Sequence, residues 1–95
     1  MIIEIGKLTE EVMSKKVDGN KSVLNNTIEI YNGKGNMTYL KITAWGGTAD
    51  FIARHFKKND SIYIEARTRN NTYTTKNGTK IYHVYAQVVT AKIPD

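Results

Sequence analysis

The sequence contains no cysteine, which excludes disulfide bonds and thiolate metal ligands. Its lone proline, Pro94, lies beyond the last expected strand. No segment approaches the length of an apolar membrane span. The apolar opening is interrupted by Glu4 and is too short for the core of a signal peptide. We therefore expect a cytoplasmic protein.

Signatures of catalysis and of metal binding are also missing. The serines Ser14, Ser22 and Ser61 lie in no nucleophile-elbow context, and no glycine-rich phosphate-binding loop occurs. His55 and His83 are far apart, with no carboxylate or thiol at ligand spacing. We expect no catalytic residue, no metal and no cofactor, and hence a protein that is not an enzyme.

Length and charge set further bounds. The chain has 95 residues, enough for one domain, and we assign residues 1–92 to it and residues 93–95 to a short tail. A core of this size is small, which favours a homo-oligomer. Fourteen Lys and Arg against nine Asp and Glu give a formal net charge of +5, which favours a polyanionic partner.

Alternating apolar and polar residues dominate the sequence and predict a protein made mostly of β-strands. The expected strands are residues 2–8, 24–31, 39–45, 61–69 and 80–89. In the first of them, Ile3 and Ile5 share one face and Glu4 takes the other. Asp18-Gly19-Asn20 indicates a turn, residues 32–36 a loop, and Asn77-Gly78 a type I′ hairpin turn.

One short helix is expected between the third and fourth strands. Ala49, Ile52, Ala53 and Phe56 follow the spacing of one helix face, and Thr48 is a plausible cap. Five strands with a helix in this position are typical of the oligonucleotide/oligosaccharide-binding (OB) fold. The sequence therefore predicts an all-β protein, a five-stranded Greek-key barrel with an extended hairpin.

The third expected strand has two different faces. Leu40, Ile42 and Ala44 form an apolar face, while Tyr39, Lys41, Thr43 and Trp45 form the other. Aromatic rings beside cations are what single-stranded nucleic acid needs, because bases stack on the rings and phosphates contact the charges. The mixture recurs at Tyr63, Arg67 and Arg69, and again at Tyr73, Lys76 and Lys80 on the hairpin.

Aromatic residues are common in strands, so these rings can instead cover the barrel or fill a subunit interface. We favour that interpretation for Tyr63, Tyr82 and Tyr85, and the stacking one for Tyr39 and Trp45. The pairs Lys15-Lys16 and Lys57-Lys58 are typical of solvated turns.

Several segments, taken together, resemble the bacterial-type single-stranded DNA-binding proteins of cells, phages and plasmids. The resemblance covers most of the chain, and these are the segments that carry it: Gly6-Lys7-Leu8, residues 23–30, Tyr39-Leu40-Lys41-Ile42-Thr43-Ala44-Trp45-Gly46, residues 56–66, Arg67-Thr68-Arg69, and Tyr73 with Asn77-Gly78-Thr79-Lys80-Ile81-Tyr82. It implies sequence-nonspecific binding of single-stranded DNA in replication, recombination, repair or plasmid and phage transfer. It also implies a homotetramer, with a dimer as the second choice.

The resemblance also implies roles for single residues. Those expected to stack on bases are Tyr39, Trp45, Tyr73 and Tyr31. Those expected to contact phosphates are Lys41, Arg67, Arg69, Lys76, Lys80 and Lys7.

The chain departs from the family pattern in three places. Residues 9–16 lack the usual Asp-Pro, the hairpin carries extra residues between Arg69 and Tyr73, and the sequence ends without the flexible linker and acidic tip that recruit enzymes in cellular members. We therefore expect no recruitment of repair enzymes through such a tail. Two alternatives stay open: a barrel that serves as a protein-interaction module in a replication-restart complex, and a general binder of single-stranded RNA or DNA.

Overall fold

Six strands and one helix follow one another along the part of the chain that the structure describes. The computed structural model describes residues 1–31, 33 and 35–94, and the side chains of residues 71–73 and 81–83 lie outside this description. The elements are β1 (Ile2–Leu8), β2 (Ser14–Val17), β3 (Lys21–Tyr31), β4 (Met37–Trp45), α1 (Gly46–His55), β5 (Ser61–Thr74) and β6 (Lys80–Lys92).

Five of the strands close into a barrel. Strand β1 pairs with β5 on one side and with β3 on the other, and the sheet runs from β5 through β6 and β4 back to β3. The contact between β4 and β6 is parallel and the other pairings are antiparallel. A closed five-stranded barrel with one helix after β4 confirms the predicted OB fold.

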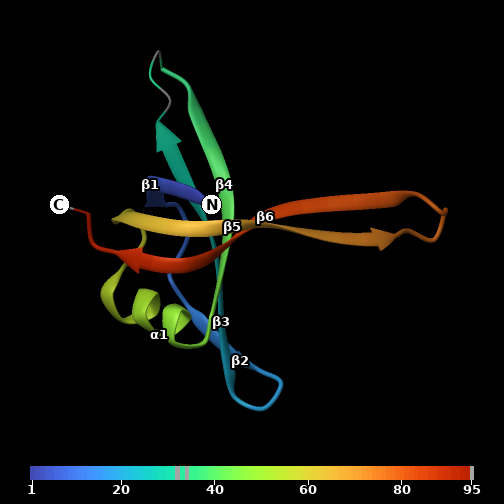
Figure 1. Ribbon diagram of the computed structural model, residues 1–95, viewed down its shortest axis with the longest axis horizontal. Coiled ribbons are helices and arrows are strands. Elements are labelled where there is room, and N and C mark those ends of the chain that lie inside the picture. Colours follow the sequence, from blue (N-terminus) through green and yellow to red (C-terminus); the bar gives the residue numbers. More distant parts are fainter. Residues whose placement is uncertain (32, 34, 95) are drawn as a thin grey trace.

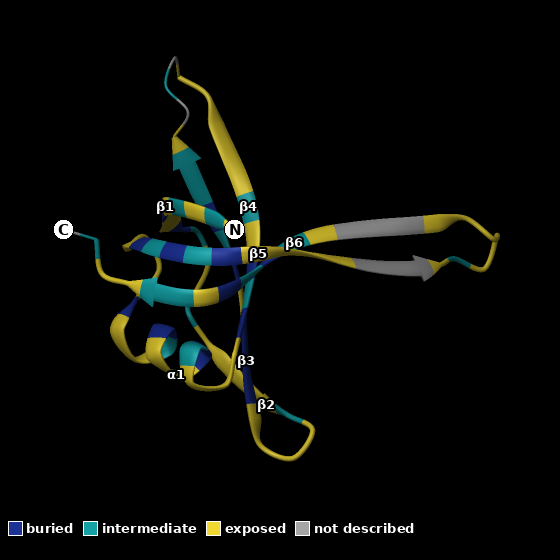
Figure 2. Cartoon of the chain, viewed as in Figure 1, coloured by how far each residue is buried: buried dark blue, intermediate teal, exposed yellow. Residues whose placement is uncertain are grey.

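Hairpins extend beyond the barrel, and one of them is formed by β2 and β3 (Figure 1). The distal parts of β5 and β6 project as a long arm, and the upper parts of β3 and β4 form a second projection. Figure 2 shows that the buried segments lie where the strands cross the barrel, while most of the described residues of the projections are exposed. The molecule therefore presents a small closed core with long strands reaching away from it.

The core forms from the strand faces that the alternation predicts. Ile42 and Ala44 of β4 are buried, and Leu40 is half-buried, while Tyr39 and Trp45 point to the outside. The helix covers the barrel with Ala49, Ile52 and Phe56, as the apolar spacing predicts. The remaining buried apolar residues of this cluster are Leu8, Leu24, Ile28, Ile62, Ile64, Ala66, Ala86 and Val88.

Several expected boundaries are wrong. Residues 14–17 form strand β2, which pairs with β3, so Lys15 and Lys16 lie in a strand and not in a turn. Strand β3 already begins at Lys21, and β5 and β6 continue to Thr74 and Lys92. The extensions are polar strands held by pairing with a neighbour, which the local hydrophobic pattern does not reveal.

Two local predictions are also wrong. No side chain caps α1, whose N-cap residue is Trp45, so Thr48 does not have the expected role. The arm ends in a turn in which Gly78 N–H donates to Thr75 O at 2.9 Å, and Gly78 alone has a positive φ, of 79°, while Asn77 does not. This is a type I turn followed by a left-handed glycine, and not a type I′ turn, because the loop has one residue more than a two-residue hairpin.

Candidate nucleic-acid interface

The outer face of β4 carries the aromatic and basic residues that the sequence analysis selected. Tyr39 is 62% exposed and Trp45 is 44% exposed, so both rings are accessible from outside the barrel. Lys41 lies between them and is exposed. The alternating pattern along β4 therefore brings two rings and one charge to a single outward face.

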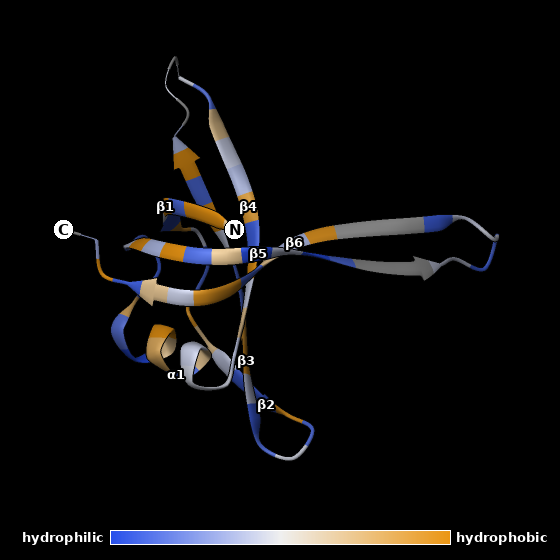
Figure 3. Cartoon of the chain, in the orientation of Figure 1, coloured by the Kyte–Doolittle hydropathy of each residue, from blue (hydrophilic) through white to orange (hydrophobic). Residues whose placement is uncertain are grey.

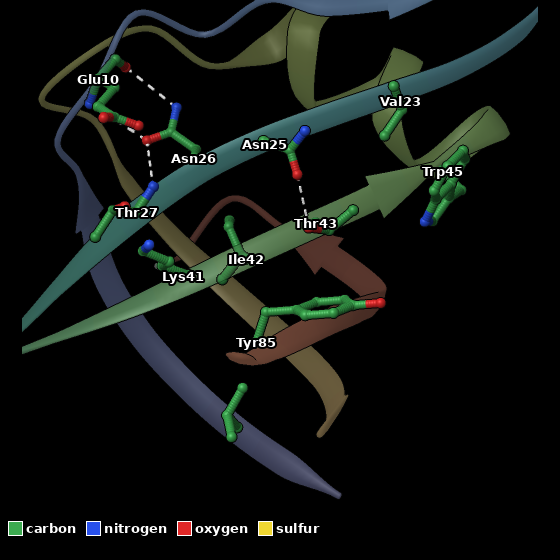
Figure 4. A pocket seen from close by; sticks show the side chains of 11 residues that line it. Glu10, Val23, Asn25, Asn26, Thr27, Lys41, Ile42, Thr43, Trp45 and Tyr85 are labelled. Atoms are coloured by element: carbon green, nitrogen blue, oxygen red, sulfur yellow. Dashed lines mark hydrogen bonds between the residues drawn. The ribbon is translucent and has the colours of Figure 1, made fainter. Parts of the chain in front are cut away.

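A groove of about 640 Å³ runs along this face. Lys41 and Trp45 from β4 line it together with Tyr85 from β6 (Figure 4). Its other lining residues are Glu10, Val23, Asn25, Asn26, Thr27, Ile42, Thr43 and Val84. A groove with rings and a cation matches the needs of a strand of bases and phosphates.

Tyr85 reaches the groove through the parallel contact between β4 and β6. Ile42 pairs with Ala86 in this contact, and both are buried. The neighbouring positions therefore point outward together, Lys41 beside Tyr85 and Thr43 beside Gln87. From the sequence alone, Tyr85 is expected to cover the barrel or to fill a subunit interface. Its place in the groove follows from a pairing between distant segments.

Polar side chains on β3 and β4 fix the floor of the groove. Thr43 Oγ1 donates to Asn25 Oδ1 at 2.7 Å across the two strands. Asn26, which is 3% exposed, binds the backbone of Glu10 on both sides: its Oδ1 accepts from Glu10 N–H and its Nδ2 donates to Glu10 O, each at 3.2 Å. These bonds hold the segment after β1 against β3, where Glu10 forms part of the groove wall (Figure 4).

Two arginines of β5 lie next to the groove. Arg69 pairs with Tyr85, which lines the groove, and Arg67 pairs with Gln87, two residues further along β6. Arg69 Nε donates to Gln87 Oε1 at 2.9 Å. A guanidinium has five N–H donors, so this bond orients the group and leaves donors for a phosphate.

The arm continues the positive charge away from the barrel. Between Glu65 and Asp95 the sequence has no acidic residue, and its basic residues there are Arg67, Arg69, Lys76, Lys80 and Lys92. Lys76 and Lys80 are exposed at the end of the arm. The side chain of Tyr73 lies outside the described residues, as do those of Tyr82 and His83.

Two further predicted residues lie outside the groove. Tyr31, at the end of β3, is 65% exposed and pairs with Met37, in the projection that contains Tyr39. Lys7 is exposed on β1, which neighbours β3 and β5 but not β4. The fold thus brings Lys41, Trp45 and Tyr85 together in the groove. Tyr39 and Tyr31 lie further along the β3–β4 ladder, and Lys7 lies apart from all of them on β1.

Tyr63 belongs to a different surface. Its hydroxyl donates to Glu65 Oε2 at 3.1 Å, and Lys92 Nζ lies 5.8 Å from the centre of its ring. Its pKa is raised above 10.0, mainly by partial burial, with contributions from the bond to Glu65 and from the charge of that carboxylate. These contacts lie on a surface apart from the groove, and the expected role of Tyr63, to cover the barrel or to fill a subunit interface, stays a prediction.

The described residues contain no cluster of three or more His, Cys, Asp or Glu that can hold a metal ion. No helix among them combines the length and apolar character that a membrane span requires.

A closed OB barrel with rings and cations on its outer face defines a protein of the class that binds single strands. The sequence matches the single-strand binding protein family over residues 1–93, and the chain belongs to this family. It is 27% identical over 88 residues to Single-stranded DNA-binding protein 1 of Clostridium acetobutylicum, an alignment that covers 85% of this chain and 80% of the relative. Membership of the family makes it a binding protein and not an enzyme.

Proposed function

We propose that this protein binds single-stranded DNA without reading its sequence, by stacking bases on aromatic rings and contacting phosphates with Lys and Arg. The observation that carries the proposal is the groove in which Lys41, Trp45 and Tyr85 come together. The name of the Clostridium relative supports DNA over RNA as the bound strand. The protein then coats single strands during replication, recombination, repair or plasmid and phage transfer.

In this proposal each ring of the outer face takes one base. Trp45 and Tyr39 are the main platforms, and Tyr85 adds a further ring inside the groove. Tyr31 extends the row along the upper projection, and Tyr73 serves the arm. Each stack contributes about 1–3 kcal/mol and tolerates any base, because every base has a π face. The binding is therefore independent of sequence.

The phosphates contact the cations beside the rings. Lys41 lies in the groove, and Arg67 and Arg69 flank it. Lys76 and Lys80 extend the contact along the arm, and Lys7 adds charge from β1. These contacts make the affinity fall with salt, because each phosphate that is neutralised releases condensed counterions.

The fluorescence of Trp45, the one tryptophan of the chain, tests the proposal. A thymidine oligonucleotide should quench it substantially, whereas duplex DNA of equal length should change it little. An RNA of equal length measures the preference for DNA. Trp45→Ala should weaken binding by about 1–3 kcal/mol without unfolding the barrel, and Tyr39→Ala should cost a similar amount.

Unchanged fluorescence at saturating oligonucleotide would contradict the proposal and favour a protein-interaction module. So would a Trp45→Ala variant that unfolds while Tyr39→Ala binds normally, because the indole would then belong to a core or an interface. The exposed fraction of Trp45, 44% in the single chain, supports the binding role.

We also propose that the protein is a homo-oligomer, a tetramer or else a dimer, that associates through β1. Ile3 and Ile5 are 59% and 55% exposed on the outer face of this strand. Figure 3 shows β1 as hydrophobic along much of its length. Light scattering at micromolar concentration should give a mass above one chain, and Ile5→Lys should lower it. A wild-type protein that is strictly monomeric would contradict this.

A further inference from the structure

We propose that the bound strand continues past Trp45 onto the outer face of the β2–β3 hairpin, where Lys15 contacts a phosphate. This proposal rests on the proposed function and extends its surface to a strand that the sequence analysis did not anticipate. The register places this hairpin at the Trp45 end of β4, because β2 pairs with residues 21–24 of β3 and Val23 pairs with Trp45. Figure 1 shows the β2–β3 hairpin at the end of β3 opposite to the projection that β3 and β4 form.

The register places Lys15 on the same face as Trp45. Lys15 pairs with Val23 on β3, and Val23 pairs with Trp45 on β4. Residues that are paired across neighbouring strands point to the same side of the sheet, so these three form one row. Two strand spacings put the backbone of Lys15 about 10 Å from that of Trp45, within the reach of a lysine side chain and one nucleotide.

A second hollow, of about 200 Å³, continues the groove along this row. Glu11, Met13 and Lys15 line it on the hairpin side. Val23 and Asn25 line both the hollow and the main groove, so the two share a wall on β3. A strand that leaves the Trp45 end of the groove therefore meets an existing depression.

Lys16, the next residue, faces the other way. It pairs with Ser22, and its Nζ donates to Ser22 Oγ at 3.0 Å. Helix α1 contacts β2 and β3 on the barrel side, where Leu24 is fully buried. Lys15 and Lys16 thus have the same charge and neighbouring positions but opposite faces, which makes Lys16 a matched control.

The chemistry of the hairpin suits a phosphate better than a base. Its outward residues are Lys15 and Lys21, with Val17 between them, and none of them is aromatic. Glu11 and Asp18 lie nearby and disfavour a dense cluster of phosphates. The hairpin therefore takes a single phosphate contact at Lys15, with Lys21 as a second cation further along the same face.

The test is a length series of oligothymidines, from about 4 to about 16 nucleotides, the range of site sizes for one OB fold. Lys15→Ala should bind the shortest oligonucleotides like the wild type and the longer ones about fivefold more weakly at 0.1 M salt. This factor follows from a slope of about 0.7 in log K against log salt for one contact to a single strand. With long oligonucleotides the slope of Lys15→Ala should be smaller by the same amount. Lys16→Ala should match the wild type at every length.

If Lys15→Ala bound oligothymidines of every length with the affinity of the wild type, the inference would be wrong. It would also be wrong if Lys15→Ala and Lys16→Ala lost the same affinity, because such a loss indicates general charge attraction only. A loss at the shortest length would also overturn it, because Lys15 would then belong to the main groove. If the oligonucleotide still quenches the fluorescence of Trp45 in both variants, the proposed function stands and only the contact at Lys15 is wrong. If it quenches the fluorescence in neither variant nor in the wild type, the proposed function itself is wrong.

Discussion

Closure of the barrel depends on a close approach of β1 to β3 at Gly6, and Gly6→Ala tests it. A Cβ added at Gly6 would lie 3.0 Å from Ile28 Cβ, 3.1 Å from Glu29 O and 3.2 Å from Ile28 Cδ1. The two Ile28 atoms belong to a side chain that is fully buried, and Glu29 O is a backbone atom of β3, the strand on which β1 closes the barrel. Neither can move away easily. Overpacking of this kind costs about 1–3 kcal/mol.

Thermal unfolding at a fixed protein concentration measures this cost. For a domain of this size 1 kcal/mol corresponds to about 4–8 °C, so a cost of 2 kcal/mol lowers the Tm of Gly6→Ala by about 8–16 °C. Gly47→Ala is the control, because nothing lies within 4 Å of its added Cβ and its φ is not positive. Since Gly47 lies in α1, this variant should be as stable as the wild type or up to about 1 kcal/mol more stable.

A Gly6→Ala protein with the Tm of the wild type would refute the reasoning, because β1 would then not approach β3 as closely as the geometry requires. A fall in Tm of equal size in both variants would show a general effect of losing glycine. The oligonucleotide affinity of folded Gly6→Ala should stay close to that of the wild type, because Gly6 is not part of the groove.

Three further predictions concern the groove and its support. Tyr85→Ala should weaken binding of a thymidine oligonucleotide by about 1–3 kcal/mol, whereas Phe51→Ala, which removes an exposed ring from α1, should leave the affinity unchanged in the same titration. Equal affinities of the two variants would contradict a stacking role for Tyr85. Arg69→Ala should reduce the slope of log K against log salt by about 0.7, and Lys58→Ala, in the turn after α1, should not change it. Asn26→Leu should lower the free energy of unfolding in urea by about 1–3 kcal/mol, because Glu10 loses both bonds that hold its backbone; a stability equal to that of the wild type would show that they contribute nothing.

Properties that depend on neighbours along the chain could be predicted from the sequence. The division of β4 into a buried face with Ile42 and Ala44 and an outer face with Tyr39 and Trp45 follows from the period of two in a strand. The amphipathic helix follows from its apolar spacing in the same way. Together with the order of the strands, these local patterns are sufficient to predict the OB fold and to select most residues of the candidate interface.

Properties that depend on pairing between distant segments were decided only by the tertiary structure. The pattern of β1 puts Ile3 and Ile5 on one face but does not say that this face is the outer one, because Ile2 and Leu8 on the other face are apolar as well. Strand β2 is too polar to be recognised without its partner β3.

The position of Tyr85 shows why a pairing between distant segments cannot be predicted from local patterns. Its strand alternates as any half-buried strand does, and the sequence gives no sign that β6 lies parallel to β4. That contact forms because the barrel must close, and closure fixes which residues of β6 stand beside Lys41. The register between two strands is a property of the whole barrel, and a pattern within one strand does not contain it.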